Sequence, residues 1–265
     1  MLKQKKTIEQ AYQYGESLGV SVWCEDEAGP YQTKPYDGAS WQPVAHPAHL
    51  PHEYIRNGTA KLLTLFRPAT GQVRMKGVMS ATNAVLHDWL KQELTDILAH
   101  LPKPAPVTDQ QVNRAFWERW RKKVRTKHSL LSADLPPLRM LLILDNLVGH
   151  KTPELVLWCF RHGILPIYTP VAGSWLNMAE SLQRIFKRRA LDGTYPGSAY
   201  AIIRAFESVA AHWNLHPTPF VWAGKRKARR DRAALKRHLL GASGAAIVRP
   251  SRSRFLTRWS WQVTH

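Results

Sequence analysis

The stretch MLLILDN, Met140–Asn146, places five apolar residues directly before an aspartate. A short apolar run of this kind is typical of a strand that is buried on both faces of a sheet. The next segment, TPELVLWCFRHG, predicts a helix with Thr152 as its cap, Pro153 at its first position and Gly163 just past its end. A further strand, ILPIYTP, follows. This order predicts a parallel pair of strands with Asp145 at a carboxyl end, where α/β folds place their sites.

The upstream segments add antiparallel strands. GVSVWCED predicts a strand that runs into acids, and TAKLLTLFRPATGQVRMKGVMS predicts two strands joined at residues 69–71. ATNAVLHDWLKQELTDILAHL predicts a helix with one apolar face, and two more helices are expected after the last strand, the first ending near Leu191. These connections imply an α/β fold with a mixed sheet flanked by helices.

The charge balance points to a polyanionic partner. The 265 residues include 38 Lys and Arg against 19 Asp and Glu, a net charge of +19, and nucleic acid is the leading candidate. No apolar run approaches the roughly 20 residues that cross a bilayer, and the first ten residues lack a signal-peptide core. We therefore expect a cytoplasmic protein without a membrane partner. Cys24 and Cys159 are expected to be buried free thiols.

Three regions are expected along the chain. Residues 1–19 form an N-terminal helix or linker, residues 20–222 form the α/β domain, and residues 223–265 form a basic tail with twelve Lys or Arg against one Asp. Residues 103–136 are an insert within the domain, and their middle part predicts a basic, aromatic helix. The tail is expected to contact nucleic acid, with a solvated tail that only aids solubility as the alternative.

Acids at the ends of two strands are the candidate chemical groups. Asp145 follows one strand, and Glu25, Asp26 and Glu27 follow another. Alternation of side chains places Asp26 on the face of Val22 and Cys24, and the other two acids on the opposite face, so Asp26 is preferred. The alternative for Asp145 is a turn cap before the next helix.

Glu180 is the third candidate. It lies in the first turns of a predicted helix, on a polar stripe with Asn177, Arg184 and Lys187 at spacings of three and four residues. The alternative is an ordinary solvated face, on which Glu180 interacts favourably with the helix dipole.

Four segments resemble DDE transposases of the mariner-type superfamily, in the bacterial insertion-sequence branch. LILDNLVGH (142–150) and YTPVAGSWLNMAES (168–181) are similar to the second and third acidic motifs, EDEAG to the first, and NLHPTPFVW (214–222) to the segment after the core. The 34 residues between Asp145 and Glu180 match the spacing of that superfamily. The resemblance covers residues 20–222.

The resemblance implies an RNase H-like fold with a mixed five-stranded sheet, in which Asp26, Asp145 and Glu180 converge as catalytic acids. They would hold Mg²⁺ or Mn²⁺, as two ions, for cleavage of DNA at element ends and joining of the 3′-hydroxyl to target DNA. A homodimer or larger assembly on DNA, associated with the bacterial nucleoid, would be the working form.

The resemblance also suggests supporting residues. Glu27, Asn146, His150 and Asn177 are expected as accessory residues, with local turn hydrogen bonding as the alternative for Asn146 and His150. DNA contacts are expected from the following residues: Trp175, Arg184, Lys187, Lys225, Arg226, Lys227, Arg229 and Arg230. For Trp175 the alternative is core packing.

One feature departs from the family. Such transposases carry an N-terminal helix-turn-helix region, whereas about 20 residues precede the first strand of this sequence. The sequence is therefore expected to be a catalytic half, from a separate reading frame, a truncated copy or a fragment. Two alternatives stay open: an RNase H-like nuclease for branched or hybrid nucleic acid, and a non-enzymatic nucleic-acid-binding remnant in which the three acids need not converge.

Overall fold

The computed structural model describes residues 2–38, 43–46, 49–121 and 134–222. The basic tail, with the five Lys and Arg residues expected there to bind DNA, lies outside the described residues, as does the part of the insert between 122 and 133. Everything below concerns the described part of the chain up to Phe220, which forms one compact unit.

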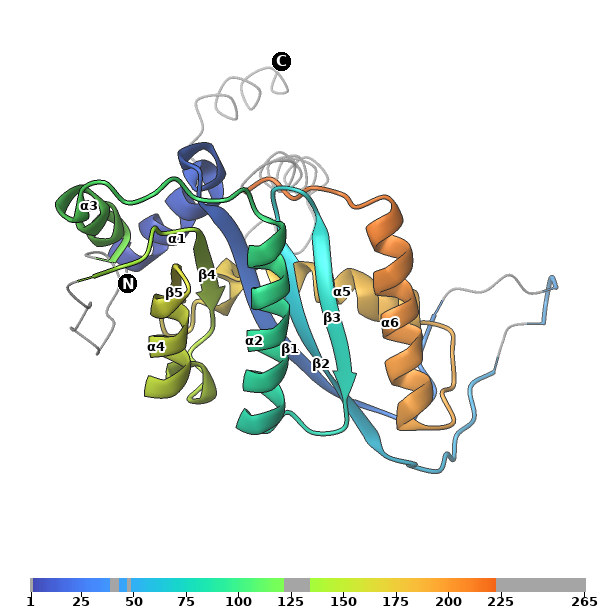
Figure 1. Cartoon of the computed structure of the whole chain (residues 1–265). Coiled ribbons are helices and arrows are strands. Elements are labelled where there is room, and N and C mark those ends of the chain that lie inside the picture. Colours follow the sequence, from blue (N-terminus) through green and yellow to red (C-terminus); the bar gives the residue numbers. More distant parts are fainter. Residues whose placement is uncertain (1, 39–42, 47–48, 122–133, 223–265) are drawn as a thin grey trace, which may run out of the picture. The chain divides into compact units, whose positions relative to one another are not determined.

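A mixed five-stranded sheet forms the centre of this unit, in the order β3-β2-β1-β4-β5 (Figure 1). The strands are β1 (Ser21–Gln32), β2 (Thr59–Arg67), β3 (Gln72–Val78), β4 (Met140–Leu144) and β5 (Ile164–Tyr168). β1 pairs antiparallel with β2 and β2 with β3, whereas β1, β4 and β5 are parallel. The RNase H-like sheet expected from the sequence is confirmed.

Six α-helices are found in the described residues: α1 (Leu2–Tyr14), α2 (Asn83–His100), α3 (Gln110–Arg121), α4 (Pro153–Arg161), α5 (Met178–Leu191) and α6 (Ala199–Leu215). Short 3₁₀ turns lie at Glu16–Leu18 (η1), Gly149–Lys151 (η2) and Ser174–Leu176 (η3). α2 and α4 pack in one apolar cluster with the sheet, and α5 and α6 contact β1, β2 and β3 from the other face (Figure 1). The sheet is therefore covered on both faces.

The helix boundaries follow the local signals in the sequence. The side chains of Thr82, Thr152, Asn177 and Ser198 each accept a hydrogen bond from the first turn of the helix that follows, which satisfies an amide group that has no partner inside the helix. Gly163 ends α4 with a positive φ of 73°, a conformation that glycine adopts at low cost.

Strand β1 is longer than the sequence predicts. We expected it to end at the acids, but it continues to Gln32, and its pairing with β2 resumes at Tyr31 after a shift in register beyond Ala28. On its other side β1 pairs with β4 only as far as Cys24 and Ile143. The acids therefore lie where β1 separates from β4 while it is still held by β2.

Candidate active site

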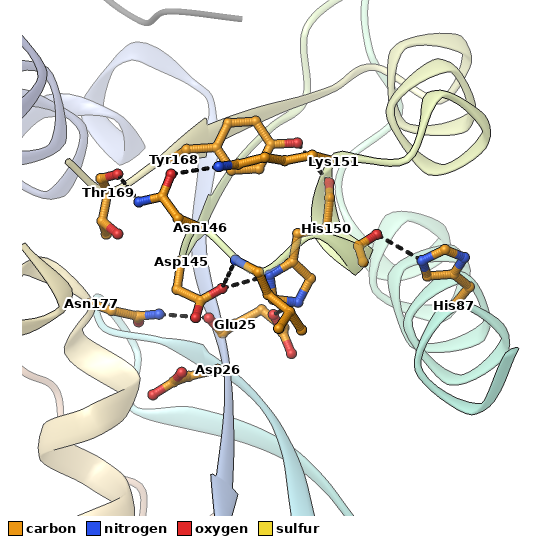
Figure 2. A network of polar contacts seen from close by, with 12 residues as sticks. Glu25, Asp26, His87, Asp145, Asn146, His150, Lys151, Tyr168, Thr169 and Asn177 are labelled. Carbon is orange, nitrogen blue, oxygen red and sulfur yellow. Dashed lines mark hydrogen bonds and ion pairs between the residues drawn. The ribbon is translucent and has the colours of Figure 1, made fainter. Parts of the chain in front are cut away.

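Asp26 and Asp145 occupy equivalent positions on neighbouring parallel strands. Cys24 and Ile143 are the last residues of β1 and β4 that pair with each other, and each aspartate follows its member of that pair by two residues. Figure 2 shows the two side chains close together at this edge. The topology thus brings together two of the three acids predicted from the sequence.

The pKa of Asp26 depends on burial and on the charged residues around it. Burial, and after it the negative charges of Glu25, Asp145 and Glu180 in that order, together raise the pKa of Asp26 to about 8. Like charges disfavour ionisation only at short range, so all three predicted acids lie within one electrostatic environment. At neutral pH, Asp26 is therefore mostly protonated unless a cation offsets the neighbouring charges.

Glu180 lies in the first turn of α5. Its side chain is 25% exposed, and its Oε2 lies 3.7 Å from a guanidinium nitrogen of Arg184 one turn later. Asn177, at the helix cap, donates to the carbonyl of Glu25 at 2.6 Å. One turn after Glu180, Gln183 donates to the carbonyl of Asp26 at 3.2 Å. α5 is thus attached to β1 on both sides of Glu180.

A buried histidine joins the second acid to β1. Nδ1 of His150 lies 2.8 Å from Oδ1 of Asp145, and Nε2 lies 2.8 Å from Oε2 of Glu25; Figure 2 shows this group. The contact with Glu25 has the distance of an ion pair but not the geometry of a hydrogen bond, and Oε1 of Glu25 has no hydrogen-bond partner among the described residues. Burial opposes the charged imidazole, yet Glu25 and Asp145 raise the pKa of His150 to about 10.

These contacts leave part of Asp145 open. Its Oδ1 accepts both from His150 and from the amide of Leu147, while no described residue donates to Oδ2. Partial burial raises the pKa of Asp145, but the hydrogen bonds from His150 and Leu147 outweigh it and hold that pKa below its usual value. The turn bond to Leu147 is the one expected for a cap, so Asp145 closes its turn and still presents an ionised oxygen.

The loop after β4 is fixed to three other elements. Asn146 donates to the carbonyl of Thr169 at 2.5 Å and accepts from Lys151 at 2.7 Å. Tyr168 donates to the carbonyl of His150, and Nε2 of His87 on α2 lies 2.9 Å from the carbonyl of Gly149 (Figure 2). For Asn146, the bond from Lys151 is local, as in the alternative of local turn hydrogen bonding, whereas the bond to Thr169 connects the loop to the residue after β5. His150 goes beyond that alternative, because its ring reaches β1.

The remaining candidates lie around this centre. Glu27 is half-buried, and burial together with Glu25 raises its pKa. Trp175 is 49% exposed in η3, with the ammonium group of Lys5 5.3 Å from its ring centre. The core-packing alternative for Trp175 is therefore wrong. Arg184 and Lys187 are exposed on α5.

Sequence reasoning missed Glu25 as a partner in the site. Its side chain is completely buried on β1, two residues after Trp23. A carboxylate is rarely fully buried unless it is paired. Two features of the sequence were the available signal for this pairing. Glu25 is a charged residue at the end of an apolar run, and His150 follows another strand.

The acids suit a hard divalent cation in their chemistry. Carboxylate oxygens are the ligands that Mg²⁺ and Mn²⁺ prefer, and the charge repulsion around Asp26 is what a cation would relieve. Within the described ranges, no three His, Cys, Asp or Glu side chains are gathered closely enough to form a ready-made metal site. The carboxylate donors therefore suit such an ion in their chemistry, but their side chains are not arranged as a formed coordination site.

The comparisons with known proteins identify a segment around two of these acids. Residues 103–202 match the family described as DDE superfamily endonuclease. Residues 103–202 are thus similar to a DDE superfamily endonuclease domain. Asp145 and Glu180 lie inside this matched segment, whereas Asp26 lies upstream of it. A comparison with curated proteins gives no match.

Solved structures similar to this chain include those of the Mos1 transposase and of BIV integrase. The Mos1 transposase in a paired-end complex with the left transposon end is 14% identical, with a TM-score of 0.43 over 80% of this chain and 59% of that chain. The catalytic core of BIV integrase is 11% identical, with a TM-score of 0.39 over 76% of this chain and 88% of that chain. The chain thus spans less than two thirds of the length of that Mos1 chain. No described helix is both long and apolar enough to cross a membrane.

Proposed function

We propose that this chain is the catalytic domain of a metal-dependent DNA transposase, which cleaves phosphodiester bonds at element ends and joins the 3′-hydroxyl to target DNA. The observation that carries this proposal is the position of Asp26 and Asp145 at the ends of adjacent parallel strands, with Glu180 close enough to affect the pKa of Asp26. The family match over residues 103–202 supports the same reaction class.

Each acid has a distinct part in the proposed reaction. Asp145 would offer its ionised Oδ2, because His150 and Leu147 engage Oδ1. Asp26 would lose its proton when a cation enters the group, and Glu180 would complete the ligand set from α5. Two bound Mg²⁺ or Mn²⁺ ions would activate the attacking water or 3′-hydroxyl and stabilise the leaving oxygen.

The surrounding residues hold these oxygens and the substrate in place. His150 fixes the rotamer of Asp145, and Asn177 and Gln183 fix α5 against β1. The exposed cations Arg184 and Lys187 lie on the same helix as Glu180 and would contact phosphates of the DNA. The basic tail would add further phosphate contacts, and the protein would act as a dimer or larger assembly on DNA in the bacterial cytoplasm.

The test is cleavage of DNA by the full chain. We expect nicking of a supercoiled plasmid in Mg²⁺ or Mn²⁺ but not in EDTA, and Asp145→Asn should abolish it with the fold intact. Asp88→Asn, an exposed acid on α2, is the matched control and should nick as wild type does. An active Asp145→Asn enzyme would contradict the proposal.

Joining of strands separates this proposal from the two alternatives. A transposase domain should join a 3′-hydroxyl oligonucleotide end to the plasmid, whereas an RNase H-like nuclease should cut hybrid or branched substrates without joining. A remnant without enzymatic function should bind the plasmid and leave it intact in both metals.

A further inference from the structure

One side of helix α1 faces the start of α5. Lys5, Ile8 and Tyr12 recur at spacings of three and four residues, which places them on one stripe of the helix. Ile8 is completely buried, and the ammonium group of Lys5 lies 5.3 Å from the ring centre of Trp175 in η3. The same stripe therefore reaches the segment that leads into Glu180.

Tyr12 bridges the junction between η3 and α5. Its hydroxyl donates to the carbonyl of Leu176 at 3.1 Å and accepts from the amide of Met178 at 3.2 Å. The first amides of a helix have no partner within the helix. The cap residue Asn177 satisfies the amide of Ala179, and Tyr12 satisfies that of Met178. Because Leu176 and Met178 are buried, water would replace this bridge poorly.

Tyr12 also lies against the strand of the first acid. Burial and the neighbouring Cys24 raise the pKa of the Tyr12 hydroxyl well above its usual value, so the hydroxyl keeps its proton as a donor. Cys24 is two residues before Asp26 on β1, and Met178 is two residues before Glu180 on α5. One side chain from α1 thus connects the elements that carry the first and third acids.

We propose that Tyr12 is a positioning residue for the cleavage reaction: by fixing the start of α5, it sets where Glu180 lies relative to Asp26 and Asp145. This inference rests on the proposed function. It extends the working catalytic unit to α1. This helix precedes both the predicted catalytic domain, residues 20–222, and the matched segment, residues 103–202.

Tyr12→Phe tests the inference, because it keeps the ring and removes only the hydroxyl. Tyr14→Phe is the matched control on the same helix, since Tyr14 is 55% exposed. In the full chain we expect amide hydrogen exchange at the start of α5 to accelerate about tenfold, the factor for one hydrogen bond of ordinary net strength. With Mn²⁺ and supercoiled plasmid, kcat for nicking should fall about tenfold, while KM and the affinity for a random-sequence duplex stay within about twofold.

Several results would overturn this role. Unchanged exchange at the start of α5 in Tyr12→Phe would show that the hydroxyl does not hold the junction. An exchange increase spread evenly over the sheet, or a loss of duplex affinity equal to the loss of kcat, would show a merely structural role. If the wild-type chain nicks no DNA, the proposed function fails, and exchange at the start of α5 alone then decides whether Tyr12 fixes the position of Glu180.

Discussion

The imidazole of His150 and the carboxylate of Glu25 lie 2.8 Å apart with side chains that are 1% and 0% exposed. Removing one partner of such a buried pair strongly destabilises the folded protein, since the other partner is left as an uncompensated buried charge. Glu25 therefore has a structural importance that its position on the face opposite Asp26 did not reveal.

We expect Glu25→Leu to lower the free energy of unfolding by about 3 kcal/mol, because His150 would lose a buried counter-ion. The double variant Glu25→Leu/His150→Leu should recover part of this loss. Urea unfolding of the two single variants and the double variant measures the coupling. Additive losses would show that the two side chains do not act as a pair.

The stability of the metal-free protein should fall as the pH rises from about 4 to about 8. Asp26 has a folded-state pKa of about 8, against an ordinary value of 3.8, so in that window the folded state holds a proton that the unfolded state releases. Stability from this group is fully present below the ordinary pKa and is lost as the pH passes through 8.

Asp26→Asn removes this pH dependence. In EDTA at pH 8, we expect the variant to be more stable than wild type by about 2 kcal/mol. The full pKa shift of Asp26, at about 1.4 kcal/mol per pKa unit, sets an upper bound above this value. At pH 4 the two proteins should be equally stable. Equal stability at pH 8 as well would show that Asp26 is ionised at no cost in the folded state.

Divalent cations should stabilise the wild-type chain through the same acids. At ten times its dissociation constant, Mg²⁺ or Mn²⁺ should add about 1.4 kcal/mol, which corresponds to a rise in Tm of about 3–5 °C for a domain of this size. Asp145→Asn should lose most of this rise, and the control Asp88→Asn should keep it. Differential scanning fluorimetry with and without EDTA provides the measurement.

The exposed cations of α5 should contribute to DNA binding in a salt-dependent way. If Arg184 and Lys187 each neutralise one phosphate, Arg184→Gln/Lys187→Gln should reduce the slope of log affinity against log salt by roughly 1.8. The comparison is with Arg161→Gln, which removes an exposed cation on α4. Fluorescence anisotropy with a random-sequence duplex from about 50 to 200 mM salt gives both slopes; an equal change in the Arg161 variant would rule out a specific role for α5.

Local signals predicted much of the fold. Thr152, Pro153 and Gly163 marked both ends of α4, and the apolar run before Asp145 is strand β4 as expected. The predicted end of β1 was wrong. Gly29 and Pro30 are residues typical of a turn, but the shift in register after Ala28 lets β1 pair with β2 again from Tyr31. A sequence gives turn chemistry locally, but whether two strands pair again after an interruption depends on the partner strand.

The site was predictable to the extent that topology alone places it. Asp26 and Asp145 follow strands that the order of elements makes parallel, so their nearness could be anticipated. The roles of Glu25 and Tyr12 could not, because each acts on a residue far along the chain. Alternation along β1 shows which face Glu25 occupies but not which side chain meets it there.

The attachment of α5 to β1 uses the backbone of β1, since the carbonyls of Glu25 and Asp26 accept from Asn177 and Gln183. Every amino acid supplies such a carbonyl, whatever its side chain. The acids of β1 can therefore be exchanged one at a time without removing the anchors of the helix that carries Glu180. A substitution at residue 26 therefore changes a side chain beside Asp145 and leaves both anchors of α5 in place.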